Sequence, residues 1–125
     1  DPNCGYCKRF ARDLQNVDDI TVYTFLYPIL SPDSEQKSKQ IWCSPDRTKA
    51  WDEFFVSGTV PDNKGDCSNP VAATQALGQK LRIQATPTMI LADGSILPGA
   101  VPLARLESAM KEAEADAKKV AAAKK

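Results

Sequence analysis

The chain has 125 residues, enough for one domain that buries roughly two thirds of the surface its unfolded form exposes. Sixteen basic residues balance sixteen acidic ones, which argues against nucleic acid as a partner. No apolar run approaches the ~20 residues that a membrane span requires, so we expect a soluble chain. Because it begins at Asp1 without an initiator methionine or apolar leader, we also expect that it has been processed or trimmed.

The first ten residues, Asp-Pro-Asn-Cys-Gly-Tyr-Cys-Lys-Arg-Phe, form the most informative stretch. Cys4 and Cys7 flank Gly5-Tyr6, and helical spacing follows at once, which places both sulfurs in the first turn of a helix. Unpaired backbone N–H groups and the positive end of the helix dipole favour thiolate over thiol there. The pattern predicts a redox centre.

Cys4 is the predicted attacking sulfur, because helix-start amides lower a cysteine pKa from about 8.5 to roughly 3.5–7.5. Cys7 lies one turn further in, close enough to form an internal disulfide. The alternatives are a zinc half-site and a purely structural Cys4–Cys7 bridge. Zinc needs four ligands, yet the chain has no histidine, and Cys43 and Cys67 are widely spaced. We therefore favour the redox interpretation and expect no metal.

Two elements are predicted directly after the cysteine pair. Apolar residues at Phe10, Ala11 and Leu14 form one stripe, which indicates a helix of about three turns. Residues 20–27 form a β-branched and aromatic run closed by Pro28, which predicts a strand buried on both faces.

Residues 34–81 are predicted to form a helical insertion. A turn with a capping serine precedes a helix over 35–43, a second helix runs from about Asp46 to Gly58, and a loop covers 59–68. The third helix is predicted to begin with Asn69 as its cap and Pro70 at its first position, and to carry the apolar residues Val71, Ala72, Leu77 and Leu81.

Two features of this insertion bear on function. The aromatic residues share the spacing of a single buried face, which favours core packing over an aromatic binding surface; they are Trp42, Trp51, Phe54 and Phe55. Cys43 and Cys67 are well placed to staple the insertion in an oxidising compartment, although two buried free thiols are the alternative. Closing a loop of about 25 residues would stabilise the fold by roughly 3 kcal/mol.

The last third of the chain predicts a hairpin and a helix. Residues 83–91 pass through Thr86-Pro87 into an apolar strand, 92–95 supply a turn, and 95–99 form a short return strand. Pro102 opens the final helix, whose inner face carries Leu103, Leu106 and Met110. Residues 111–125 propagate it with a solvated face, which we favour over a membrane-binding or partner-binding role, and its end is expected to fray.

This order of elements is that of a thioredoxin-like α/β fold. The whole chain closely resembles the catalytic domain of bacterial periplasmic thiol:disulfide isomerases of the DsbC/DsbG type. The resemblance rests on Cys4-Gly5-Tyr6-Cys7, on Ile41-Trp42-Cys43 with Cys67 as the second structural cysteine, and on Thr86-Pro87 before the hairpin.

The resemblance implies that Thr86-Pro87 is a cis peptide facing the redox centre, where it pairs with an extended substrate strand. A proline that merely ends a helix is the alternative. Family members also carry a strand directly before the redox cysteines and an N-terminal dimerisation domain, and both are absent from this sequence. We therefore expect a fragment of a longer chain that is a homodimer when full-length.

The implied function is disulfide isomerisation or reduction on misfolded secreted proteins in the periplasm, without a cofactor. Cys4 and Cys7 would react, and Gly5 and Tyr6 would help to set the relative stability of thiolate and disulfide. A membrane thiol reductase of the DsbD type would keep the pair reduced. The alternatives are an oxidase of the same fold and chaperone-like binding of unfolded chains without redox turnover.

Overall fold

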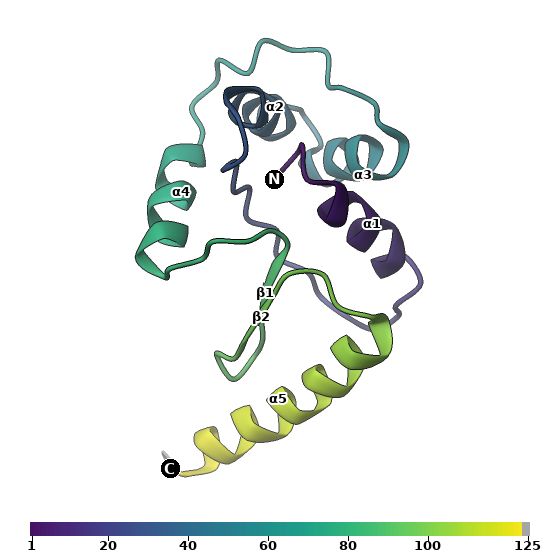
Figure 1. The fold of residues 1–125 in the computed structure, drawn as a ribbon, viewed down its shortest axis with the longest axis vertical. Coiled ribbons are helices and arrows are strands. Elements are labelled where there is room, and N and C mark those ends of the chain that lie inside the picture. Colours follow the sequence, from purple (N-terminus) through teal and green to yellow (C-terminus); the bar gives the residue numbers. More distant parts are fainter. Residues whose placement is uncertain (124–125) are drawn as a thin grey trace.

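The computed structural model describes residues 1–123, and these contain five helices and one two-stranded sheet (Figure 1). The elements in chain order are α1 (Gly5–Leu14), α2 (Pro32–Trp42), α3 (Arg47–Ser57), α4 (Val71–Lys80), β1 (Thr88–Ile90), β2 (Ile96–Pro98) and α5 (Leu103–Ala123). Helices α1, α2 and α3 lie together near the N-terminus, α4 flanks α2, and α5 forms the opposite end of the molecule. Residues 124–125, the predicted frayed end, lie outside the described part.

Side-chain caps determine where the helices of the insertion begin. The Ser31 hydroxyl accepts a hydrogen bond from the Ser34 amide, so α2 begins at Pro32, three residues earlier than predicted. The Asp46 carboxylate accepts from the Lys49 amide, so α3 begins at Arg47, within one residue of the predicted start. Helix α3 ends at Gly58, whose φ of 75° is the left-handed conformation that glycine adopts without strain.

Helix α4 begins one residue later than predicted. Pro70 occupies the N-cap position instead of the first helical position, and the Asn69 side chain accepts from the Val71 amide at 3.1 Å. Of the apolar residues predicted for this helix, Val71 is buried, whereas Leu77 and Leu81 are exposed, and Leu81 lies just past the end of α4. Gly78 faces the core instead, because the Tyr27 ring packs so closely that a Cβ at residue 78 would overlap it.

The prediction of a strand over 20–27 buried on both faces is also wrong. The segment is extended but lies outside both described strands, and Tyr23 and Phe25 are 82% and 66% exposed. Only its end is buried, at Leu26 and Tyr27. Strand propensity needs a neighbouring strand to take effect. Here the end of the segment contacts helix α4 instead of a strand: the Thr74 hydroxyl donates a hydrogen bond to the Leu26 carbonyl at 2.8 Å.

The main core cluster lies between α1, α2 and α3. It consists of Cys4, Cys7, Leu26, Ile41, Ala50, Phe54 and Phe55, with Ala11, Trp42 and Trp51 packed against it. Trp51 stacks on Phe55 with ring centroids 3.8 Å apart, and Phe54 meets Phe55 edge to face at 5.3 Å. The predicted core packing of these aromatic residues is therefore confirmed, and Cys4 and Cys7, the predicted redox pair, belong to the same cluster.

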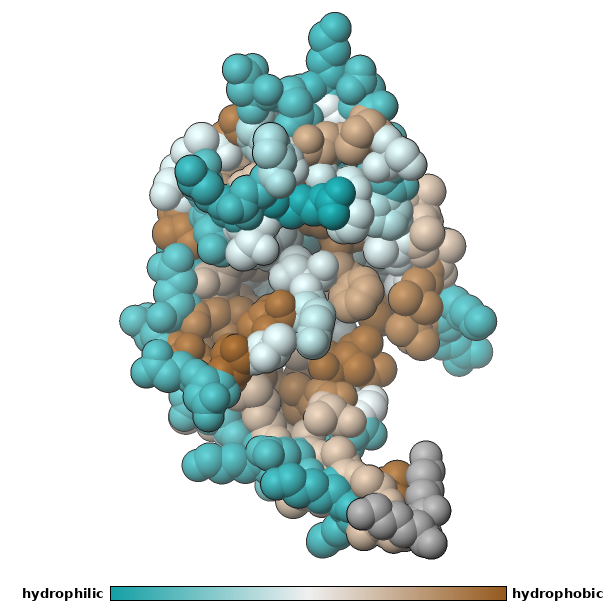
Figure 2. Space-filling model, turned by 180° about the vertical axis from the view of Figure 1, so that it is seen from behind, coloured by the Kyte–Doolittle hydropathy of each residue, from teal (hydrophilic) through white to brown (hydrophobic). Residues whose placement is uncertain are grey.

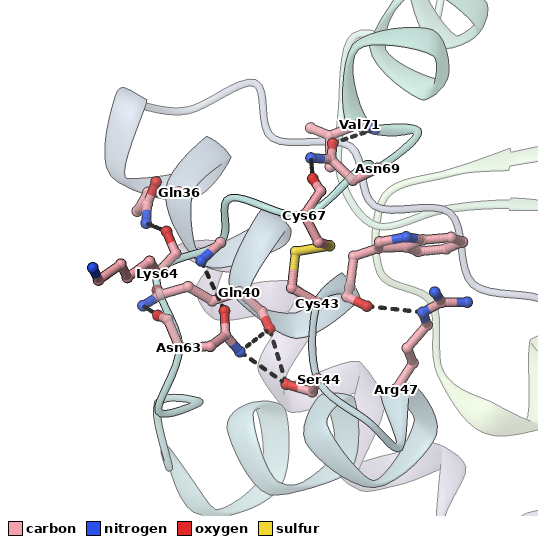
Figure 3. The surroundings of a disulfide bond; sticks show 12 residues. Gln36, Gln40, Cys43, Ser44, Arg47, Asn63, Lys64, Cys67, Asn69 and Val71 are labelled. Carbon is pink, nitrogen blue, oxygen red and sulfur yellow. Dashed lines mark hydrogen bonds between the residues drawn. A yellow bond between two sulfur atoms is a disulfide. The ribbon is translucent and has the colours of Figure 1, made fainter.

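A disulfide between Cys43 and Cys67 joins the end of α2 to the loop before α4 (Figure 3). Side chains fasten the same loop to α2: Gln40 donates to the Asn63 carbonyl, and Asn63 donates to the Gln40 carbonyl, each at 2.8 Å. Gln36 adds a bond to the Lys64 carbonyl at 2.7 Å. The insertion is thus closed by one covalent bond and a set of amide contacts.

The predicted hairpin and final helix are present. Strands β1 and β2 pair antiparallel, with Met89 opposite Leu97, around a turn in which Gly94 has a φ of 86°. Leu106 is buried and Leu103 and Met110 are half-buried on one face of α5. Among residues 1–123, no helix has both the length and the apolar character that crossing a membrane requires.

Candidate active site

Cys4 is the N-cap residue of α1. Its backbone is extended (φ −88°, ψ 114°), and its Sγ accepts a hydrogen bond from the Cys7 amide at 3.1 Å. This is the role that serine or aspartate oxygens play at other helix starts. The sulfur therefore lies where an unpaired N–H and the helix dipole both favour negative charge.

The segment before the hairpin approaches the same sulfur. The Thr86 carbonyl oxygen lies 3.3 Å from Cys4 Sγ and accepts a hydrogen bond from the protonated thiol. The Thr86-Pro87 peptide is cis, as the resemblance implied. Cys4 and Thr86 are 82 positions apart in the sequence but are in contact in the fold. The Cys4 sulfur therefore has one hydrogen-bond partner in its own helix and one in the cis-proline loop.

The two thiols are free, and each is only 6% exposed. Burial raises the pKa of Cys4, but hydrogen bonds from the Cys7 side chain, the Thr86 side chain and the Cys7 amide outweigh it, so the pKa lies below its ordinary value. Burial raises the pKa of Cys7 to about 11. The arrangement provides one sulfur that ionises readily beside one that holds its proton, which is suited to sequential attack.

The spacer residues leave the approach to the helix start open. A Cβ at Gly5 would meet no atom within 4 Å, and Tyr6 is 64% exposed, with the Arg9 guanidinium 5.8 Å from its ring centroid.

Within residues 1–123, no group of three or more His, Cys, Asp or Glu side chains is arranged to hold a metal ion.

Sequence reasoning missed two polar residues beside the dithiol. Asp1 is buried and bonds to the backbone of Ile29 and Leu30, and Asn3 bonds to side chains at the start of α2. The Asp-Pro-Asn stretch is recognisable turn chemistry, but the sequence alone does not reveal partners 28 or more residues away.

Residues 1–114 match the family described as thioredoxin-like domain. The chain belongs to the thioredoxin-like domain family. The predicted thioredoxin-like fold, with its helical insertion before the hairpin, is thereby confirmed.

Several relatives of this thioredoxin-like chain are named for thiol:disulfide interchange. A probable thiol:disulfide interchange protein DsbC of Bordetella parapertussis is 47% identical over 108 residues, which are 86% of this chain and 38% of the relative. The thiol:disulfide interchange protein DsbC of Escherichia coli is 33% identical over 106 residues, covering 82% of this chain and 44% of the relative. The resemblance to this class of protein is thus confirmed.

A solved structure agrees with these relatives. The crystal structure of a disulfide interchange protein from Neisseria gonorrhoeae superposes with a TM-score of 0.84 at 38% identity, covering 90% of this thioredoxin-like chain and 81% of that chain. The chain spans less than half the length of the curated relatives described above. Their similarity therefore concerns one region of longer proteins.

Proposed function

We propose that this chain is the catalytic domain of a protein disulfide isomerase and reductase, with Cys4 as nucleophile and Cys7 as resolving thiol. The observation that carries the proposal is the position of Cys4 Sγ, 3.1 Å from the Cys7 amide and 3.3 Å from the Thr86 carbonyl, with both cysteines free. The relatives named for thiol:disulfide interchange support it.

The first step is attack of the Cys4 thiolate on one sulfur of a client disulfide. A new sulfur–sulfur bond forms between Cys4 and the client while the client's own bond breaks, and the released client sulfur leaves as a thiolate. The lowered pKa of Cys4 raises the fraction of attacking anion at a given pH. The raised pKa of Cys7 keeps that thiol protonated, so it does not attack at once.

The mixed disulfide can then be resolved by either of two reactions. A client thiolate can displace Cys4, which gives a new client disulfide, regenerates the Cys4 thiolate and leaves the number of electrons unchanged. Alternatively, Cys7 loses its proton and attacks Cys4, which leaves the client with two thiols and the enzyme with a Cys4–Cys7 disulfide. The first reaction is isomerisation of the client, and the second is reduction of the client.

The client segment is proposed to bind beside the cis-proline loop. Thr86 and Pro87 present backbone next to Cys4, and an extended chain can pair with such backbone as an added strand. Gly5 leaves room for the client to reach the sulfur, and Tyr6 is exposed at the same helix start. We propose misfolded, disulfide-containing proteins as clients.

The cellular setting follows from the same proposal. Reduction of a client oxidises Cys4 and Cys7, so a reductant must reset the pair, and we propose a membrane thiol reductase of the DsbD type. An oxidising compartment, the periplasm, fits the disulfide between Cys43 and Cys67. We also propose that the full-length protein is a homodimer, assembled through a dimerisation domain outside this sequence.

Refolding of a client with scrambled disulfides tests the function. The full-length protein is incubated with the client while insulin reduction is followed in parallel, and Cys4→Ser serves as the inactive control. Recovery of the native client without net oxidation identifies an isomerase. Insulin reduction without recovery would leave only a reductase, and net oxidation of a reduced client would identify an oxidase.

A second candidate function is binding of unfolded chains without redox turnover. It is favoured by the exposed side chains Tyr6, Val22, Tyr23 and Phe25, and Figure 2 shows apolar surface gathered across the middle of one face of the molecule. A cysteine-free client distinguishes the two functions. Only chain binding predicts improved refolding of that client when Cys4 and Cys7 are both replaced by serine.

A further inference from the structure

The turn that leads into Cys4 is held by a buried carboxylate. Asp1 is 5% exposed, and its side chain accepts three backbone hydrogen bonds. Oδ1 accepts from the Asn3 amide at 2.8 Å, while Oδ2 accepts from the Ile29 and Leu30 amides at 2.7 and 2.8 Å. One side chain therefore ties the turn both to itself and to the segment before α2.

Asn3 fastens the same turn to the start of α2. Its side-chain amide donates to the Asp33 carboxylate at 2.9 Å and to the Ser34 hydroxyl at 3.0 Å, with a longer contact of 3.4 Å to the Ser31 hydroxyl. Ser31 is the residue that caps α2. Residues on both sides of Pro2, which is fully buried, thus bind to one continuous stretch, residues 29–34, which leads into α2.

These contacts end at Cys4. Its amide donates to the Asp1 carbonyl at 3.1 Å, which closes the turn and places Cys4 in the extended conformation of an N-cap residue. That conformation is what aims Sγ at the Cys7 amide. A shift of the turn would move the sulfur away from this donor and from the Thr86 carbonyl together.

We propose that Asp1 is a positioning residue for the nucleophile: its carboxylate fixes the turn that holds Cys4 Sγ against the Cys7 amide, with Asn3 as a second, weaker fastening. The inference rests on the proposed function only for its consequence in catalysis. A carboxylate suits this task, because its two oxygens accept several hydrogen bonds from backbone amides at once.

Positioning and simple electrostatics predict opposite results when the charge is removed. A carboxylate near a thiolate disfavours it, so loss of the Asp1 charge alone would lower the pKa of Cys4. Loss of positioning removes the amide hydrogen bond and raises that pKa. Asp1→Asn removes the charge at nearly constant shape, whereas Asp1→Glu keeps the charge but adds a methylene group to a buried site.

The test is the pH profile of Cys4 alkylation in full-length protein, with iodoacetamide as the probe and Cys7→Ala as the common background. We expect both Asp1 variants to raise the midpoint by about one pH unit, so that alkylation well below the midpoint slows about tenfold. Asn3→Ala should raise it by less. Asp18→Asn, at an exposed loop position, is the matched control and should leave the midpoint unchanged.

Circular dichroism confirms that each variant is folded before alkylation is measured. If Asp1→Glu does not fold, Asp1→Asn and Asn3→Ala still decide the matter. A lowered or unchanged midpoint in these two folded variants overturns the inference. Because alkylation needs no client, this result is independent of the refolding assay: a wild-type protein without isomerase activity would contradict the proposed function and leave the positioning role measurable.

Discussion

The sulfur of Cys4 lies 3.1 Å from the backbone nitrogen of Cys7, so the second cysteine of the motif donates a hydrogen bond to the first before any disulfide exists. One residue thereby has two parts to play. Its amide stabilises the Cys4 thiolate, and its own thiol, with a pKa raised to about 11 by burial, waits in the protonated form. This asymmetry leads to the first two predictions.

Replacing each cysteine by serine should give two different phenotypes. Cys4→Ser should reduce thiol–disulfide exchange to the uncatalysed rate, because the remaining thiol at the helix start, Cys7, has a raised pKa and stays protonated. Cys7→Ser should accumulate a covalent adduct with a disulfide-containing client, since the resolving thiol is lost while the Cys7 amide remains. Non-reducing electrophoresis and mass spectrometry measure the adduct. Equal activity of both variants would rule out the two-cysteine mechanism.

The stability of the reduced protein should fall as pH rises from 9 towards 11. Cys7 has a folded-state pKa of about 11 against an ordinary value of 9.0, so its contribution to stability is complete below pH 9 and is lost as pH rises through the folded value. Cys4, whose pKa is lowered, acts in the opposite sense: its contribution to stability is gained as pH rises to the ordinary value of 9.0 and adds no loss above it. Urea denaturation at several pH values measures the effect.

The oxidised protein is the matched control for this pH dependence. With Cys4 and Cys7 joined in a disulfide, neither thiol titrates, so the loss of stability between pH 9 and 11 should be smaller by the contribution of Cys7. Identical slopes for the reduced and oxidised proteins would show that the fold does not hold Cys7 in its neutral form.

Removing the disulfide of the insertion should weaken the fold but spare the chemistry. The double variant Cys43→Ser/Cys67→Ser frees a loop with a sequence separation of 24, which should lower the free energy of unfolding by about 3 kcal/mol. Calorimetry or urea titration measures the loss. Cys4 alkylation per folded molecule should stay the same, and a large change in that rate would mean that the bridge also shapes the dithiol.

Gly78→Ala should destabilise the protein, although alanine normally favours a helix interior. The added Cβ would overlap the Tyr27 ring, whose hydroxyl donates to the Ile83 carbonyl at 2.8 Å and so resists displacement. Overpacking of this kind costs about 1–3 kcal/mol, which at least offsets and over most of that range exceeds the ~1 kcal/mol gained in helix propensity.

A thermal melt measures this effect, with two comparisons. Gly5→Ala meets no atom within 4 Å and should keep or raise the melting temperature. Combining Gly78→Ala with Tyr27→Leu should remove the overlap, so the double variant should be less destabilised than the two single effects added together. Strict additivity would contradict close packing between these two residues.

Local chemistry explains why most elements could be predicted from the sequence. Asp46 and Gly58 limit α3 through their own cap geometry, and the Asp93-Gly94 turn produces the hairpin because glycine adopts the positive φ required there. The cysteine pair was recognisable for the same reason, since its spacing and the helix start are both local.

Predictions that depended on distant neighbours were the ones that failed. Residues 20–27 have strand propensity, but the end of this segment packs beside α4, where the Thr74 hydroxyl donates a hydrogen bond to the Leu26 carbonyl. The sequence placed Leu77 and Gly78 in a helix but did not reveal which of them faces the core: Leu77 is exposed, and Gly78 packs against the Tyr27 ring. The hydrogen bond from the Ile29 amide to the Asp1 carboxylate is likewise a tertiary contact, and no periodic pattern in the sequence indicates it.

Cys4 and Cys7 share their core cluster with Leu26, Ile41 and Phe54, which come from three separate parts of the chain. The reactive tetrapeptide is therefore also a piece of the protein interior. Grafting Cys-Gly-Tyr-Cys onto an unrelated scaffold would therefore transfer the four residues without the packing that surrounds their sulfurs. An engineer who wants the chemistry must bring the surrounding helices with it.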